Sequence, residues 1–177
     1  AVAMGSGSTA SNTGSVSIGA NAQATQYSEF AHSSGRFTTS GDAQYSRFVA
    51  RNLTTDGTAT ELFLDGSTSR LTLDDDSMYS FNIMVTAMEY GSGNESAWWH
   101  VRGGIARNDT FFVSSPAIIG TNTVDTGNAG GSSTNWTFTA TADTTNGSLK
   151  LEVQNVGAGP GTNVKWVAVV EVAKVSV

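Results

Sequence analysis

The fold is decided by three successive lines of sequence: AVAMGSGSTASNTG (residues 1–14), SVSIGANAQATQYS (15–28) and EFAHSSGRFTTSGD (29–42). The lines align without gaps, each 14 residues long, and each opens with side chains that alternate along the chain. The aligned columns hold Val2, Val16 and Phe30; Met4, Ile18 and His32; Ala10, Ala24 and Thr38; and Gly5, Gly19 and Ser33. A short repeat of this kind predicts a β-solenoid or β-roll, in which each line forms one rung of two short strands and two turns.

A single rung cannot bury a core of its own. It offers about two apolar side chains, too few to offset the cost of ordering its backbone, roughly 1–2 kcal/mol per residue. A rung therefore needs neighbours above, below and beside it. Three identical chains around an axis would supply the missing side, so we expect a homotrimer. The side chains expected at its axis are Val2, Met4, Val16, Ile18, Phe30 and His32.

His32 is the polar member of these columns. Three copies that meet at an axis could form a metal or anion site, or a layer that responds to pH. The alternative is a polar layer satisfied by backbone groups or water. The chain contains only 2 histidines, so one chain alone cannot build a multi-histidine metal site. We expect no metal and no cofactor.

Beyond residue 42 the 14-residue period ends and longer alternating segments begin. They predict nine or ten short strands and no helix, because no segment keeps an apolar spacing of i, i+3, i+4 and i+7. The expected strands are Tyr45–Arg51, Thr60–Leu64, Arg70–Leu73, Met78–Met88, Glu95–Arg107, Phe111–Val113, Trp136–Ala142, Leu149–Val153 and Val164–Val175. We therefore predict an all-β protein, with a β-roll repeat stalk over 1–42 and a jelly-roll-like β-sandwich tip over 43–177.

Three segments between the expected strands are rich in turn residues. The Gly-rich, polar segment Gly120–Thr134 predicts a mobile loop, and Gly157–Gly161 predicts a second loop. Asn146-Gly147 predicts a two-residue hairpin.

Composition excludes several classes of function. The 9 basic and 15 acidic residues give a net charge of −6, which disfavours binding to nucleic acid or to anionic lipid. No cysteine is present, so disulfides and thiolate–metal sites are excluded. No run of about 20 apolar residues is present, so no membrane insertion is expected. The chain begins within a repeat and without Met or a signal segment, so we expect a piece of a longer polypeptide.

The four tryptophans divide into two groups by strand face. Trp99, Trp136 and Trp166 share faces with apolar residues and are predicted to anchor the core. Trp98 points the other way, together with His100 and Arg102, because successive strand residues face opposite sides. An aromatic ring beside Arg and His indicates a sugar-stacking or interface patch, and we take these three as candidate receptor-binding residues. The alternative is that Trp98 is buried between subunits or under a loop.

Signals for catalysis or metal binding are weak. The run Asp74–Asp76 could offer oxygen ligands to calcium, but acidic residues in a turn more often keep it solvated. Glu89 and Glu95 flank one turn and could form the carboxylate pair of a glycosidase, although they are better explained as solubilising residues. No G-x-S-x-G motif or metal-binding histidine pair is present. We expect no enzymatic activity.

Four motifs carry a resemblance to known proteins. The line Ser15–Ala24 resembles the head repeats of trimeric autotransporter adhesins, which form trimeric β-rolls. With Ala31–Phe37, Glu61–Gly66 and Thr141–Lys150, nearly the whole chain resembles the C-terminal region of bacteriophage tail-fibre proteins. The resemblance implies a homotrimeric, receptor-binding tip in the extracellular virion, joined to an upstream part of the fibre.

The function expected from this resemblance is adsorption to a host. The tip would recognise a bacterial surface polysaccharide or outer-membrane protein, with Gly120–Thr134 and Gly157–Gly161 as candidate contact loops. Two alternatives remain open at this point. The domain could be a structural cap that registers three chains, or the head of a bacterial trimeric adhesin.

Overall fold

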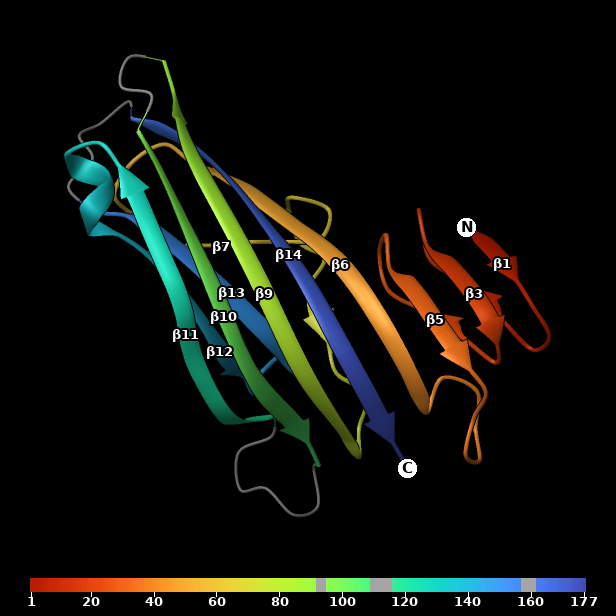
Figure 1. Ribbon diagram of the computed structural model, residues 1–177. Coiled ribbons are helices and arrows are strands. Elements are labelled where there is room, and N and C mark those ends of the chain that lie inside the picture. The colour runs from red at the N-terminus through yellow and green to blue at the C-terminus, as the bar shows by residue number, and fades with distance from the viewer. Residues whose placement is uncertain (92–94, 109–115, 157–161) are drawn as a thin grey trace.

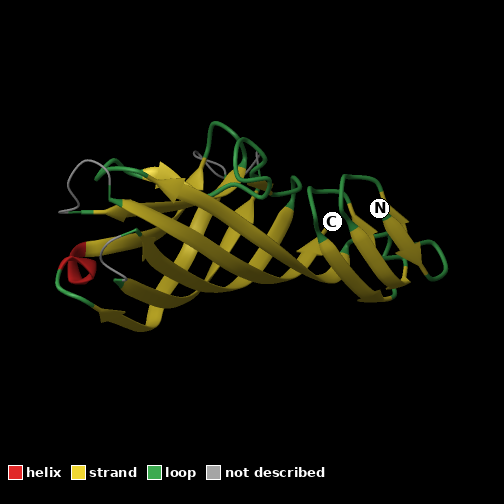
Figure 2. Cartoon of the chain, turned by 90° about the horizontal axis from the view of Figure 1, so that it is seen from above, coloured by secondary structure: helices red, strands yellow, loops and turns green. Residues whose placement is uncertain are grey.

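The computed structural model describes residues 1–91, 95–108, 116–156 and 162–177, and its secondary structure is almost entirely β (Figures 1 and 2). The prediction of an all-β fold is confirmed. Within the described ranges the only helical segment is one 3₁₀ turn, η1 (Ser132–Asn135). No helix among these residues is long and apolar enough to cross a membrane.

The 14-residue lines stack in the predicted register. Strands β1 (Val2–Met4), β3 (Val16–Ala20) and β5 (Phe30–Ser34) are parallel neighbours. Their pairing places Val2 beside Val16 and Val16 beside Phe30, as the aligned columns require. The second strand of each rung is shorter, and β2 (Thr9–Ala10) pairs with β4 (Gln23–Ala24) in parallel.

The interior of the rungs is filled by small side chains. The buried residues here include Ser15, Ser17, Ala22, Ala24, Ala31 and Ser33. Only small side chains fit between two strands of so thin a rung, and the larger residues must point away from it. In the single chain Val16, Ile18 and Phe30 are only partly buried, and Val2 and Met4 on the edge strand β1 are exposed. The apolar columns expected at a trimer axis lie on an uncovered face.

The rungs continue into one eight-stranded sheet (Figure 1). Its order is β1-β3-β5-β6-β14-β9-β10-β11. The last five strands are β6 (Ala43–Thr54), β14 (Asn163–Ser176), β9 (Ser77–Tyr90), β10 (Ser96–Arg107) and β11 (Ala117–Ala129). Because β5 pairs with β6, the sheet crosses the boundary expected at residue 42. The division into two domains stays a prediction.

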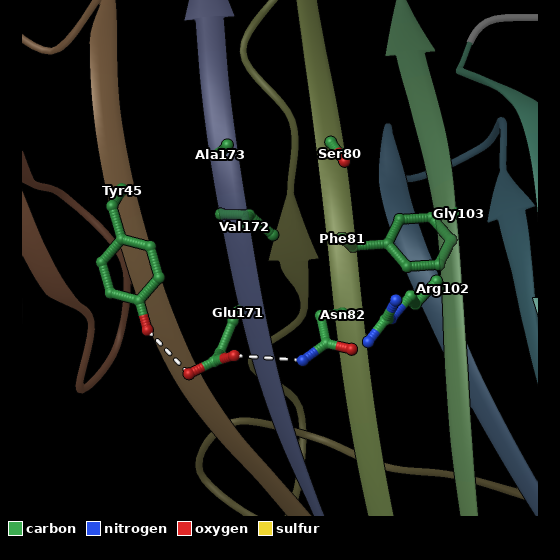
Figure 3. Close-up of a pocket in the computed structure, with 9 residues that line it drawn as sticks. All are labelled: Tyr45, Ser80, Phe81, Asn82, Arg102, Gly103, Glu171, Val172 and Ala173. Carbon is green, nitrogen blue, oxygen red and sulfur yellow. Dashed lines mark hydrogen bonds between the residues drawn. The ribbon is translucent and has the colours of Figure 1, made fainter. Parts of the chain in front are cut away.

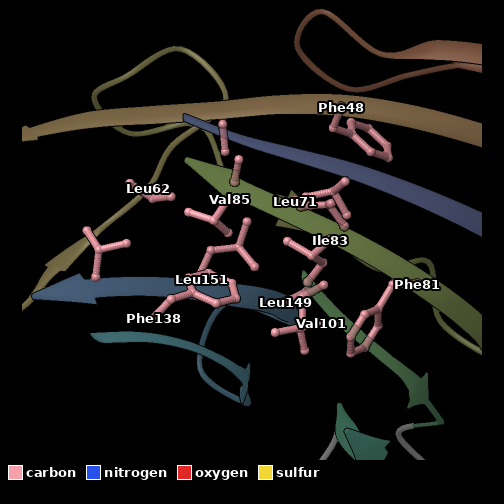
Figure 4. Packing of buried hydrophobic residues seen from close by; sticks show 14 of the residues in the cluster. Phe48, Leu62, Leu71, Phe81, Ile83, Val85, Val101, Phe138, Leu149 and Leu151 are labelled. Atoms are coloured by element: carbon pink, nitrogen blue, oxygen red, sulfur yellow. The ribbon is translucent and has the colours of Figure 1, made fainter. Parts of the chain in front are cut away.

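A smaller sheet covers one face of the large one and completes a sandwich. It contains β12 (Trp136–Asp143) and β13 (Ser148–Asn155), and β13 also pairs with β7 (Thr60–Glu61) and β8 (Leu71–Thr72). Figure 4 shows Ile83 and Val85 of β9 facing Leu149 and Leu151 of β13 across the core. One face of strands β6 to β11 therefore contacts the core, and among the described residues no second layer covers the other face.

The predicted tryptophan core is confirmed. Trp166 stacks on Trp99 with ring centroids 5.6 Å apart and lies 5.7 Å from the ring of Trp136. Its indole N–H donates to Thr54 Oγ1 at 2.9 Å, which satisfies the buried polar atom. Trp98, on the opposite face of β10, is 41% exposed.

The prediction of a loop over Gly120–Thr134 is wrong. Most of this segment belongs to β11, which pairs along its length with β10, and η1 follows it. A strand at the edge of a sheet is held by backbone hydrogen bonds to one neighbour and needs few apolar side chains, so a polar, Gly-rich sequence does not by itself indicate a loop. The expected strand Phe111–Val113 and the expected loop Gly157–Gly161 lie outside the described residues.

The hairpin at Asn146-Gly147 is present but longer than predicted. Asp143 pairs with Ser148, so four residues connect β12 to β13. The Asp143 carboxylate accepts backbone N–H bonds from Thr145 and Asn146 at 3.0 and 3.1 Å. These hydrogen bonds stabilise the four-residue turn.

A buried carboxylate joins the rungs to β6. Glu29 Oε2 accepts N–H bonds from Thr25 and Gln26 at 2.8 and 3.0 Å, and Glu29 Oε1 accepts the Ser46 hydroxyl at 2.6 Å. Burial raises the pKa of Glu29 above its ordinary value of 4.5, although these hydrogen bonds oppose the shift. Because the folded pKa is the higher one, the stability that Glu29 contributes is fully present at low pH and is lost as pH rises through that pKa.

Glu29→Gln tests this sign. Glutamine replaces one acceptor oxygen by an N–H₂ group that faces donors, which should cost about 1–3 kcal/mol at pH 4. We expect the gap in unfolding free energy between the wild type and the variant to narrow as pH rises from 4 to 7. Urea unfolding of both proteins at each pH measures the gap, and comparison of the two proteins cancels the other titrating groups. A gap that widens with pH would contradict the assigned direction.

Candidate functional site

The candidate receptor-binding residues lie on the uncovered face of the eight-stranded sheet. Trp98, His100 and Arg102 occupy successive outward positions of β10, as the alternation predicted. Phe30 and His32 of β5 pair with Arg47 and Tyr45 of β6, and the four side chains share that face. The expected axis residues and the expected receptor residues therefore lie on one continuous surface. We call the outward side of strands β1, β3, β5, β6, β14, β9 and β10 the open face.

A row of polar side chains crosses the open face (Figure 3). The Tyr45 hydroxyl donates to Glu171 Oε1 at 2.9 Å, and Asn82 Nδ2 donates to Glu171 Oε2 at 3.1 Å. Asn82 Oδ1 in turn lies 2.5 Å from His100 Nε2. These hydrogen bonds join β6, β14, β9 and β10. We call the four side chains, Tyr45, Glu171, Asn82 and His100, the polar row.

Glu171 is the charged centre of the polar row. Hydrogen bonds from Asn82 and Tyr45 lower its pKa, and Arg47 adds a weaker effect in the same direction. Burial, and then the hydrogen bond to Glu171, raises the pKa of Tyr45. Glu171 therefore remains a carboxylate and Tyr45 a neutral donor at neutral pH.

Arg102 lies beside the polar row. It pairs in register with Asn82, and with Tyr45 and Glu171 it lines a hollow of about 320 Å³ (Figure 3). Its side chain is exposed, and in the described part of the chain it makes no hydrogen bond or ion pair. The hollow thus presents a guanidinium with free donors next to a carboxylate whose acceptors are engaged.

Apolar side chains flank the polar row. Val169 pairs with Val49 on one side and with Met84 on the other, and all three point outward. Met84 is 44% exposed. Trp98 lies over β11, where a Cβ at Gly127 would come within 2.4 Å of its Nε1. A side chain at Gly127 would clash with the indole, so glycine at that position leaves room for Trp98.

Other sequence candidates have structural partners. Asp74 pairs with Lys174, and Asp76 Oδ1 accepts a hydrogen bond from Asn108 at 2.5 Å. Among the residues that the structure describes, no three acidic or histidine side chains gather as a metal-ligand set. His32 is exposed beside Tyr45, and its role at a trimer axis stays a prediction.

The suggested carboxylate pair at Glu89 and Glu95 is explained differently. Glu95 holds the 3₁₀ turn, since its carboxylate accepts the Ser132 hydroxyl at 2.5 Å and the Ser133 N–H at 2.7 Å. The hydrogen bonds from Ser132 lower the pKa of Glu95. Glu89 is buried, and its N–H donates to the Glu95 carbonyl at 2.8 Å. Glu95 therefore stabilises η1 as well as keeping the turn solvated.

Sequence reasoning missed Tyr45, Asn82 and Glu171. Each occupies an outward position of a strand that was correctly expected, but their proximity depends on the order β6-β14-β9-β10. Tyr45 and Glu171 are 126 residues apart in the chain. Only the strand order brings these side chains to His100 and Arg102.

Comparison with known proteins gives two similar solved structures. No family model and no curated protein sequence matches the chain. The tailspike protein of Acinetobacter phage vB_ApiP_P1 is 17% identical over 75% of this chain, with a TM-score of 0.37. The tailspike protein of Acinetobacter baumannii phage AM24 is 10% identical over 90% of this chain, with a TM-score of 0.39. The chain spans 22% and 33% of the lengths of these two proteins.

Proposed function

We propose that this chain is the distal part of a bacteriophage tail protein, a homotrimer that attaches the virion to a bacterial surface. The observation that carries the proposal is the apolar columns of the rungs, which point away from the small interior of the chain. Val16, Ile18 and Phe30, which lie inside the stack, are only partly buried in the single chain. Three chains around an axis would cover these columns, as the resemblance to tail-fibre ends and adhesin heads implies. The rest of the fibre would lie upstream of the trimer.

The proposed activity is binding without cleavage. The carboxylate in the hollow, Glu171, accepts hydrogen bonds from Tyr45 and Asn82. Its lowered pKa does not suit a general acid, whose pKa must lie near the working pH. Glu95 is likewise engaged by Ser132 and Ser133. The proposed ligand is a bacterial surface polysaccharide or an outer-membrane protein, bound by several weak contacts multiplied over three chains.

Adsorption assays test this function. We expect the fluorescently labelled fragment to bind host cells, and the unlabelled fragment to slow adsorption of the phage that encodes it. A heat-unfolded sample is the control for non-specific binding. A folded trimer that neither binds nor competes would contradict receptor attachment and favour a structural cap. Release of reducing sugar from host polysaccharide would contradict binding without cleavage.

A further inference from the structure

The open face carries several large apolar side chains beside its polar row. A sheet with one solvated face normally alternates apolar and polar residues, so that polar side chains face water. Here the outward positions of the central strands hold apolar side chains with substantial exposure. They include Val49, Leu53, Met84, Met88, Trp98 and Val167. Apolar patches of more than a few hundred Å² are rare on monomers and indicate an interaction surface.

We propose that a second copy of this chain covers the open face from the rungs to β10, and that Trp98, His100 and Arg102 contact this copy. The inference rests on the proposed trimer and assigns the surface by which its chains meet. It replaces the receptor-binding role that the sequence suggested for these three residues.

Continuity with the rungs favours a second copy over a receptor. Arg47 of β6 lies over the ring of Phe30 of β5, 5.6 Å from its centroid, so no break separates the rung columns from the central strands. A neighbouring chain that completes the rungs would extend along the same sheet. The seven strands of the open face, about 4.8 Å apart, span roughly 29 Å, a width that suits a protein partner better than a short glycan.

The chemistry of the face also favours a second copy. Glycans stack on aromatic rings and hydrogen-bond to polar groups. Trp98 and the polar row could serve a glycan, but Val49, Val169 and Met84 beside them offer neither kind of contact. Permanent interfaces between subunits are more apolar than transient ones. The apolar part of the open face therefore fits a contact that is always buried better than a receptor surface that stays exposed until the virion meets a host.

Charge on the open face is self-complementary. In the described part of the chain, Glu171 receives hydrogen bonds from the neutral donors Tyr45 and Asn82, and Arg47 acts on it without forming an ion pair. Arg102 makes no hydrogen bond or ion pair there. A second copy of the open face carries the same negative and positive groups, so the negative group of one copy can face the positive group of the other. Arg102 of one copy and Glu171 of the next would then form an ion pair in a desolvated contact, where charge pairs specify register.

Single cysteines can map the covered surface, because the chain contains no native cysteine. Met84→Cys is placed on the open face, and Thr139→Cys is the matched control on an outward, exposed position of β12. Both sites would be accessible in an isolated chain. We expect a bulky maleimide to label Thr139→Cys quickly, and Met84→Cys slowly until denaturant separates the subunits.

The solution mass separates this inference from the proposed function. Light scattering should give three times 18.3 kDa for the wild type and both variants. A wild-type monomer would overturn the trimer and the inference together. A trimer in which Met84→Cys labels as fast as Thr139→Cys would overturn the inference alone and make the open face available to a receptor.

A charge exchange tests the proposed ion pair. Arg102→Glu and Glu171→Arg should each shift the assembly towards monomer at low protein concentration, and the double variant should recover the trimer. Tyr45→Phe is the control for the hydrogen bond that Glu171→Arg also removes. If the double variant forms no more trimer than either single variant, the pairing of Arg102 with Glu171 is overturned.

Discussion

Replacing Trp166 by alanine is expected to lower the free energy of unfolding by about 3–5 kcal/mol, the cost of removing a large buried aromatic side chain. Trp166 is 1% exposed and lies between Trp99 and Trp136. It belongs to β14, which pairs with β6 and β9 near the middle of the large sheet. The cavity would open where both sheets meet, and the rigid strands around it cannot close it.

Urea unfolding followed by far-UV circular dichroism measures this loss, at one protein concentration for all variants because oligomerisation contributes to stability. Trp166→Phe keeps a ring but leaves the buried Thr54 hydroxyl without its donor, so an intermediate loss is expected. Thr137→Ala, at an exposed position of β12, is the control and should change stability by less than about 0.5 kcal/mol. A loss below about 1 kcal/mol for Trp166→Ala would contradict the role of Trp166 as a core anchor.

The inner face of the sandwich could be predicted because it depends on a local pattern. Alternation along Met78–Met88 placed Tyr79, Phe81, Ile83 and Val85 on one side, and all four are buried. The same alternation placed Trp98 and Trp99 on opposite faces. Successive side chains of a strand point to opposite faces of the sheet whichever strands are its neighbours.

The polar row could not be predicted because it depends on strand order. Tyr45, Asn82 and Glu171 lie on three strands that are distant in sequence and adjacent in the sheet. Each is an ordinary outward polar residue when its strand is considered alone. The edge strand β11 was missed for a related reason, since it is held by the backbone of β10 and its own side chains carry a weak signal.

The rungs show that a correct repeat does not determine which face is inside. The aligned columns were paired as predicted, yet the small residues Ser17 and Ala31 fill the interior of the chain. Ile18 and Phe30 point to the open face because they are too large for that interior. The side chains that define the repeat are therefore available for contacts between chains.

Gly19→Ala is expected to separate the rungs, with a loss of about 3 kcal/mol or more in local stability. Gly19 has a φ of 106°, a conformation that L side chains rarely adopt. A Cβ at this position would lie 2.0 Å from the Ser33 carbonyl oxygen of the next rung. Relief of that clash requires a shift of backbone, because no flexible side chain is involved.

Hydrogen exchange followed by mass spectrometry is the suitable measurement, because it resolves the rungs from the sandwich. We expect amides of 1–42 to lose protection in Gly19→Ala while those of β9 and β10 keep it. Gly35→Ala is the matched control, since no atom lies within 4 Å of its added Cβ, and it should exchange like the wild type. Equal protection in the two variants would contradict the close approach of the rungs. Loss confined to 1–42 would support the predicted domain boundary, whereas spread into β6 would show that Glu29 and its partner Ser46 join the rungs and the sandwich into one cooperative unit.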